Sequence, residues 1–241
     1  MLILITDDNI EPVHYRVLQE SLMYVDKLHI KMPAVWKLNA YVKRVNQYIY
    51  ELTENDKSLK GKIVVHLNEQ HLSDKNARPI HHLLFEEKLL DSLQQIDTMN
   101  FHLSETVSTY FISMLKNADS SFYYKRYEYN ISASVHHLNI NETYQAFSYV
   151  MYGPVFESIS KKNYGPSKNL EELKTDLKNI EETTGIPVIG VGGIRADNFA
   201  DVLKAGFSGL ALRGYIWQSA SALQTFNHFI QLWKNYKSPS Y

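Results

Sequence analysis

The sequence predicts an α/β fold, a single (β/α)₈ TIM barrel. Three observations predict it. Eight short β-rich runs alternate with longer stretches of helical period, most of the runs are largely apolar, and the 241 residues contain no cysteine and no linker-like tract. Parallel strands that are buried on both faces have such apolar sequences. Eight successive strand–helix units close into a barrel rather than forming two domains.

The expected strands are 2–6, 27–31, 62–66, 99–103, 131–135, 149–152, 187–191 and 208–212. The clearest amphipathic helices are 38–52, 170–182, 197–204 and 222–233. Glycine and proline mark the ends of the predicted elements in the C-terminal half. Gly185 before Pro187 ends a helix and opens a strand, and Gly206 is placed to cap the next helix. We expect one domain over 1–236, followed by a short frayed tail over 237–241.

The third unit is the least regular part of the pattern. Residues 67–96 are polar and longer than a minimal crossover, so we expect a decorated third βα unit. The stretch 66–82 is rich in histidine, with the four residues His66, His71, His81 and His82. Their spacing matches no zinc motif. We therefore expect solvated loop histidines there and no metal site.

Composition limits the classes of function. The chain is 44% hydrophobic and 21% charged, with a formal net charge of −1, as is typical of a globular protein with a sizeable core. The sequence contains no cluster of Lys and Arg of the kind that would indicate a nucleic-acid or membrane partner. Without cysteine there is no disulfide, thiolate nucleophile or Cys-ligated zinc. No signal peptide or membrane span is evident, so we expect a cytoplasmic protein with a small-molecule partner; a homo-oligomer is left open.

The segment 189–213 contains the strongest candidate site. A predicted strand ends in Gly192-Gly193, and the next strand ends in Arg213-Gly214. In barrels, the loops after strands seven and eight frequently bind phosphate through backbone N–H groups. A tight turn alone would also explain the two glycines, but their position favours phosphate binding.

Two further segments offer polar groups at strand ends. After the strand 149–152, Ser158, Ser160 and Lys161 suit a carboxylate or a pyrophosphate, although composition alone would favour a solvated loop. Strand alternation places Ser134 and His136 on one face and His137 on the other. His136 is therefore the candidate acid/base, because imidazole exchanges protons near neutral pH.

In these three segments the chain resembles the thiamine-phosphate synthase family, which includes the TenI-type thiazole tautomerases. The family's Ser-x-His corresponds to Ser134-Val135-His136, and its Gly-Pro-x-Phe-x-Thr-x-Thr-Lys loop corresponds to 153–161, with serines for threonines. Its Gly-Gly-Ile turn corresponds to 192–194, followed by Asn198. Fainter matches are His29-Ile30-Lys31 for Gln-Leu-Arg and His102-Leu103-Ser104 for His-Leu-Gly.

The departures from the family pattern concern its metal. In the synthase, Mg²⁺ assists the joining of a pyrimidine diphosphate to a thiazole phosphate, with release of pyrophosphate, and acidic residues after strands three and four serve that ion. Here strand three ends in Val65-His66-Leu67-Asn68 and the strand-four position is Val107, and neither offers the carboxylate oxygen that Mg²⁺ prefers. Glu69 and Glu105 are nearby and could substitute, although they are offset from the pattern. The strand-eight serine is Gly214, whose N–H can still hold phosphate.

The resemblance therefore implies a thiazole-phosphate enzyme of thiamine biosynthesis. The loss of the family's acidic metal-binding residues favours a thiazole tautomerase without a cofactor. In it, Gly193 and the strand-eight turn would hold the phosphate, Ser158 and Ser160 the carboxylate, and His136 would move the proton. The alternative is an Mg²⁺-dependent thiamine-phosphate synthase, with Lys31 and Lys161 on the pyrophosphate. A third reading is a non-catalytic regulator that binds a phosphate ligand.

Overall fold

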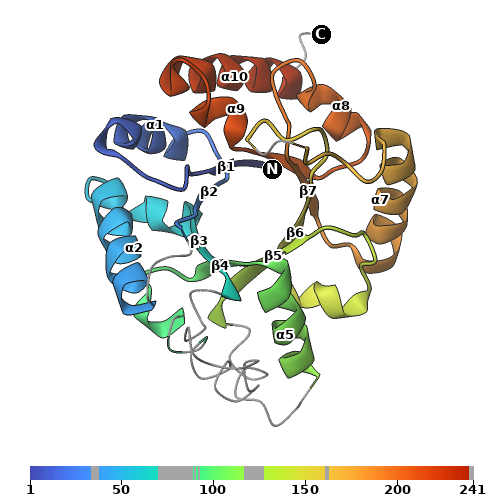
Figure 1. Cartoon of the computed structure of the whole chain (residues 1–241), viewed down its shortest axis with the longest axis horizontal. Helices are drawn as coiled ribbons and strands as arrows, with labels where there is room; N and C mark the ends of the chain where they lie inside the picture. Colours follow the sequence, from blue (N-terminus) through green and yellow to red (C-terminus); the bar gives the residue numbers. More distant parts are fainter. Residues whose placement is uncertain are drawn as a thin grey trace.

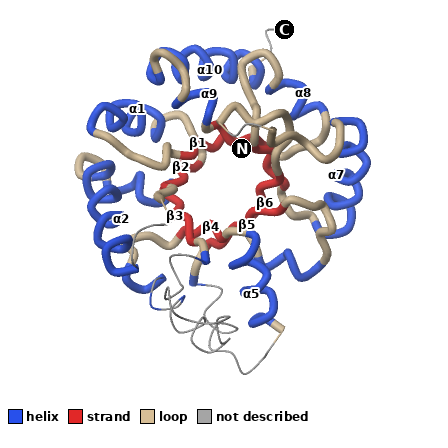
Figure 2. The backbone as a smooth tube through the Cα atoms, viewed as in Figure 1, coloured by secondary structure: helices blue, strands red, loops and turns tan. Residues whose placement is uncertain are grey.

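The computed structural model describes residues 1–33, 38–69, 89, 91, 93–116, 128–160 and 163–238. In these residues eight parallel strands close into a barrel in the order β1 to β8 (Figures 1 and 2). The ring is closed where Leu2 of β1 pairs with Leu210 of β8. The predicted (β/α)₈ barrel is therefore confirmed.

Each strand lies within one residue of its predicted bounds. The strands are β1 (Leu2–Ile5), β2 (Lys27–Ile30), β3 (Ile63–Leu67), β4 (Asn100–Leu103), β5 (Asn130–Val135), β6 (Tyr149–Tyr152), β7 (Val188–Val191) and β8 (Gly209–Leu212). The agreement follows from the short apolar runs, because burial on both faces leaves few other positions for each strand.

The helices form a ring outside the strands (Figure 1). They are α1 (Pro12–Leu22), α2 (Leu38–Thr53), α5 (Glu105–Leu115), α7 (Leu170–Thr184), α8 (Phe199–Lys204), α9 (Gly214–Trp217) and α10 (Ala222–Lys237), with the 3-10 helices η1 (Lys57–Lys62) and η3 (Glu142–Ala146). Local signals fix several ends. Asn169 caps α7 in a capping box with Glu172, and Gly185 ends it at a φ of 65°.

Two predictions at helix ends need correction. Helix α8 begins at Phe199 rather than at 197, because Asn198 occupies the N-cap and its side chain closes the preceding turn. Lys237 is the last residue of α10 rather than part of a frayed tail, and its ammonium lies 5.2 Å from the centre of the Trp233 ring. Residues 239–241 lie outside the described residues, as does most of the predicted decorated unit over 67–96.

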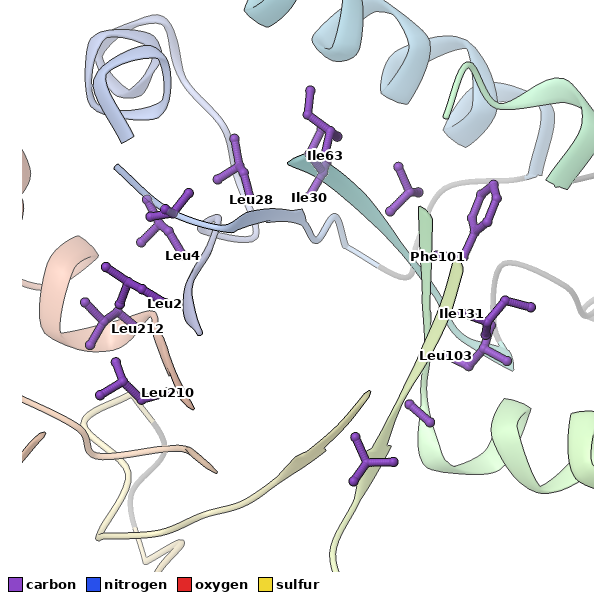
Figure 3. Close-up of a cluster of buried hydrophobic side chains, with 14 of the residues drawn as sticks. Leu2, Leu4, Leu28, Ile30, Ile63, Phe101, Leu103, Ile131, Leu210 and Leu212 are labelled. Atoms are coloured by element: carbon purple, nitrogen blue, oxygen red, sulfur yellow. The ribbon is translucent and has the colours of Figure 1, made fainter. Parts of the chain in front are cut away.

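Side chains alternate between two apolar clusters. The larger cluster joins the outward faces of the strands to the helices, and Figure 3 shows part of it, with Leu4, Leu28 and Leu103 among the labelled residues. The smaller cluster comes from strands β1, β6, β7 and β8 and consists of Ile3, Ile5, Tyr149, Met151, Ile189 and Ala211. Among the described residues, none of the helices has both the length and the apolar character that crossing a membrane requires.

Candidate active site

A cavity of about 840 Å³ lies over the carboxyl ends of the strands. Parallel barrels present their ligand-binding loops at this end. Nine of the ten site residues predicted from the sequence line this cavity: Lys31, Ser134, His136, Ser158, Ser160, Gly192, Gly193, Arg213 and Gly214. The tenth, Lys161, lies outside the described residues. Residues spread over 184 positions of sequence are thus brought to one opening by the parallel order of the strands.

The glycine turn after β7 adopts a conformation that requires glycine. Gly192 and Gly193 have φ angles of 98° and 67°, and a Cβ on Gly193 would lie 2.4 Å from the Glu157 oxygen. The side chain of Asn198 closes the turn, because its Nδ2 donates to the Gly193 oxygen at 3.0 Å. Backbone without side chains therefore faces the cavity here, as an anion site of this kind needs.

The loop after β6 runs beside that turn. Phe156 N donates to the Gly192 oxygen at 3.1 Å, which ties the two loops together. The hydroxyl oxygens of Ser158 and Ser160 are 3.5 Å apart on the cavity wall. A Cβ on Gly214 would lie 3.2 Å from the Ile159 Cβ, so the turn after β8 also packs closely against this loop. The arrangement offers two hydroxyls beside two glycine turns.

His136 lies at the cavity wall just after β5. Its Nδ1 is 2.8 Å from the Gly153 oxygen, which can only accept a hydrogen bond, so Nδ1 carries the hydrogen of the neutral ring. The Nε2 atom is then the basic position, and it lies 3.9 Å from Oε2 of Glu105. Glu105 also accepts from the His136 backbone N–H at 3.1 Å. The exposed neighbour His137 is not among the lining residues.

Two cationic side chains border the cavity. The main chain of Lys31 is fixed to the end of β1, because Lys31 N donates to Thr6 Oγ1 at 2.9 Å and that hydroxyl donates back to the Lys31 oxygen at 3.1 Å. The Arg213 guanidinium forms an ion pair with Asp8 at 2.6 Å. Together they favour an anionic ligand at this end of the barrel, although Asp8 compensates part of the charge on Arg213.

Glu69 is offset from the family's metal-binding motif in the sequence, but its carboxylate lines the cavity. Glu69 comes two residues after the end of β3, and its Oε2 accepts from the Ser104 hydroxyl at 2.9 Å. Mg²⁺ binds carboxylate oxygens and completes its shell with water and substrate phosphates. Glu69, with Asn68 beside it, therefore fits the donor set of such an ion. Val107 is fully buried in α5 and belongs to the apolar core.

Three histidines that the sequence did not bring together meet on adjacent strands. His66 was placed at the end of the predicted strand 62–66 but was also counted among the solvated loop histidines. The second expectation is wrong, because His66 lies in β3 and contacts His29 of β2 and His102 of β4. Burial lowers the pKa of all three, with His102 at about 3. The other histidines of that stretch, at positions 71, 81 and 82, lie outside the described residues. The available signal was the polar–apolar alternation within 27–31 and 100–103, together with the single polar residue of 63–67, His66.

The fold and the site define a class of protein, the (β/α)₈ barrels that have a polar cavity over the carboxyl ends of their strands. Comparison with known proteins narrows the class. Residues 126–216 match the model of a family described as thiamine monophosphate synthase. The thiamine-phosphate synthase of Methanocella arvoryzae is 41% identical over 64 residues, which are 27% of this chain and 28% of that protein. The one from Dictyoglomus turgidum is 30% identical over 93 residues, 39% of this chain and 40% of that protein.

The chain thus spans 28% to 40% of the length of these two relatives in the matched segments. Among solved structures, a thiamine phosphate pyrophosphorylase from Pyrococcus furiosus superposes with a TM-score of 0.60 at 18% identity, over 97% of this chain and 95% of that one. This likeness shows the fold. The resemblance predicted from the motifs is confirmed: the chain is similar to the thiamine-phosphate synthase/TenI family over a segment that contains β5 to β8.

Proposed function

We propose that this protein is an enzyme of thiamine biosynthesis and acts as a thiamine-phosphate synthase. The observation that carries the proposal is the joint position of the glycine turn Gly192-Gly193, the serines 158 and 160, and Glu69 around one cavity. The relatives are named thiamine-phosphate synthases, which supports the synthase. The loss of the family's acidic metal-binding residues had favoured the tautomerase. Glu69 weakens the main argument against the synthase, because a carboxylate that suits Mg²⁺ lines the same cavity.

In the proposed reaction a carbon–oxygen bond of the pyrimidine diphosphate breaks, and the same carbon bonds to the thiazole phosphate. Negative charge develops on the departing diphosphate. Lys31 and Arg213 are placed to stabilise that charge, and preorganised cations at such a position lower the barrier. An Mg²⁺ ion held by Glu69 would supply further charge neutralisation. The glycine turns after β7 and β8 would hold the phosphate of the thiazole.

The direct test supplies pure protein with the pyrimidine diphosphate, the thiazole phosphate and Mg²⁺, and measures thiamine phosphate and pyrophosphate by chromatography. We expect both products in equal amounts. Lys31→Gln should slow turnover at least about tenfold, the equivalent of roughly 1.4 kcal/mol in the barrier. The control Lys174→Gln alters an exposed lysine of α7, away from the cavity, and should behave as the unaltered protein. Absence of both products would reject the synthase.

A second candidate, the thiazole tautomerase, is favoured by one observation. His136 has its Nδ1 hydrogen committed to the Gly153 oxygen, which leaves Nε2 as a base at the cavity wall. Such a group could take a proton from one ring position and return it to another. The thiazole carboxylate tautomer, incubated alone with the protein, tests this candidate. Conversion without the pyrimidine diphosphate would support it, and an unchanged tautomer would reject it.

A further inference from the structure

The interior of the barrel is divided into an apolar half and a polar half. Strands β1, β6, β7 and β8 fill their side with the smaller apolar cluster. Strands β2 to β5 contribute mainly polar side chains at alternate positions, and Val64 of β3 is the apolar exception. The polar residues are His29, His66, Asn100, His102, Ser132 and Ser134. Barrel interiors are ordinarily packed with branched apolar side chains. The polar half therefore requires an explanation beyond packing.

Three imidazoles meet in that half. His29 Nδ1 lies 2.8 Å from His66 Nε2, and the ring centres of His66 and His102 are 4.4 Å apart. One ring nitrogen from each of the three lies within 4.8 Å of the others. His29 and His102 are 0% and 1% exposed, so water does not solvate the cluster from that side. Their neutral form offers the lone pairs that a metal ion needs.

Two of the rings are oriented by polar groups behind them. The outer nitrogen of His29, Nε2, is 2.6 Å from the Tyr149 hydroxyl across the barrel. His102 Nδ1 is 2.9 Å from Ser132 Oγ, whose own hydrogen is donated to the Phe101 oxygen at 3.2 Å. Nδ1 of His102 therefore donates, and its Nε2 has the lone pair, which accepts from the Ser134 hydroxyl at 2.8 Å and would turn to a metal ion in its place. Metal-binding histidines show this pattern, in which the second nitrogen donates to a fixed oxygen.

We propose that His29, His66 and His102 bind one divalent transition-metal ion of the zinc class at the floor of the cavity. Zinc–imidazole bonds of about 2.0–2.1 Å place the nitrogens of a tetrahedral site about 3.3 Å apart. Small ring rotations bring the three nitrogens to that spacing from distances that now lie within 4.8 Å. Imidazole ligands select zinc, cobalt, nickel or copper over magnesium, so this ion is distinct from one held by Glu69.

The fourth coordination position faces the cavity. His66 and His102 both line it, whereas His29 lies beneath them. Three protein ligands with one open position are typical of catalytic rather than structural zinc sites. Lys31 and Arg213 place positive charge near His66, which favours an anionic fourth ligand such as hydroxide or a substrate oxygen. The ligand class is therefore an oxygen anion.

The test measures metal binding in the absence of any substrate. Protein without a histidine tag is treated with a chelator, supplied with Zn²⁺ or Co²⁺, freed of excess metal by gel filtration and analysed by mass spectrometry. We expect one equivalent of metal per chain, and a visible spectrum of tetrahedral Co²⁺. Histidine nitrogen resonances in NMR should shift for three residues. Less than a stoichiometric amount in the unaltered protein would overturn the proposal, and the cluster would then be a hydrogen-bonded histidine network.

Matched variants locate the ion. His66→Gln should weaken metal affinity at least about 100-fold, and Ser132→Ala, which leaves all three ligands in place, about tenfold. His228→Gln alters an exposed histidine of α10 and should bind one equivalent as before. Equal affinity in His66→Gln and His228→Gln would overturn the proposal. Circular dichroism verifies folding, and if His66→Gln does not fold, His102→Gln and the NMR shifts of the unaltered protein decide. Because no substrate is present, the result is independent of synthase activity.

Discussion

His136 donates its Nδ1 hydrogen to the main-chain oxygen of Gly153 at 2.8 Å, and this bond links the end of β5 to the end of β6. The bond fixes both the tautomer and the direction of the ring, so that Nε2 is the atom available to a ligand. His137, the next residue, is exposed and does not line the cavity. The two histidines therefore form a matched pair for testing acid/base chemistry.

The first prediction concerns that pair. His136→Asn retains a hydrogen bond to the Gly153 oxygen but cannot exchange protons near neutral pH. If the protein is a tautomerase, kcat for the thiazole tautomer should fall about 100-fold or more, with KM changed only a few-fold. His137→Asn should leave both constants unchanged. Steady-state kinetics with the thiazole substrate measures this, and equal effects of the two variants would exclude His136 as the base.

The second prediction concerns the glycine turn. Gly193→Ala places a Cβ 2.4 Å from the Glu157 oxygen on a residue with a φ of 67°, so the turn must move. Affinity for the thiazole phosphate, measured by calorimetry, should fall at least about tenfold, or roughly 1.4 kcal/mol. Gly61→Ala is the control, because nothing lies within 4 Å of its added Cβ. Unchanged affinity in Gly193→Ala would place the phosphate elsewhere.

The third prediction concerns magnesium. If the protein is a synthase, chelation with EDTA should abolish formation of thiamine phosphate and Mg²⁺ should restore it. Glu69→Gln removes one charged oxygen ligand while Ser104 can still donate to the amide oxygen. The Mg²⁺ concentration needed for half-maximal activity should therefore rise about tenfold or more. Glu54→Gln, at an exposed position beyond α2, serves as the control. Full turnover in EDTA would contradict the synthase proposal.

The fold and the rim of the cavity were predictable because local patterns determine them. Apolar runs fixed the strands, and motifs at strand ends, such as Ser134-Val135-His136 and Gly192-Gly193, gave the side chains at the opening. The reason is geometric: in a parallel barrel every strand end reaches the same face. A residue predicted at the end of a strand could therefore also be predicted to lie at the opening of the barrel.

The barrel floor was not predicted, because it depends on contacts between strands that are distant in sequence. His29 and Tyr149 are separated by 120 residues and meet at 2.6 Å across the barrel. Strand register, which a single sequence does not reveal, decides which alternate residues share a layer. His66 was grouped with its neighbours in sequence, His71, His81 and His82, although its actual partners lie on β2 and β4. Glu69 was named as a nearby carboxylate that could replace the family's metal ligand, and its position at the cavity wall became evident only from the structure.

The last prediction uses the buried histidines to relate stability to pH in protein freed of metal by a chelator. Burial lowers the pKa values of His29, His66 and His102, the last to about 3, and the nearby Lys31 lowers the pKa of His102 further. In the unfolded chain these groups have pKa values of about 6.5. Below that pH the unfolded state therefore binds protons that the folded state does not.

The sign follows directly, because stability rises with pH wherever the unfolded state binds more protons than the folded state. The contribution is complete above about pH 6.5 and is lost progressively as the pH falls toward the folded pKa, by roughly 1.4 kcal/mol per pH unit for each histidine that stays neutral. Urea unfolding at about pH 7 and about pH 5 avoids most carboxylate titration. The urea midpoint should be lower at about pH 5, and His102→Gln should show a smaller difference between the two pH values. Equal midpoints at both pH values in the unaltered protein would mean that the three imidazoles accept protons in the folded state.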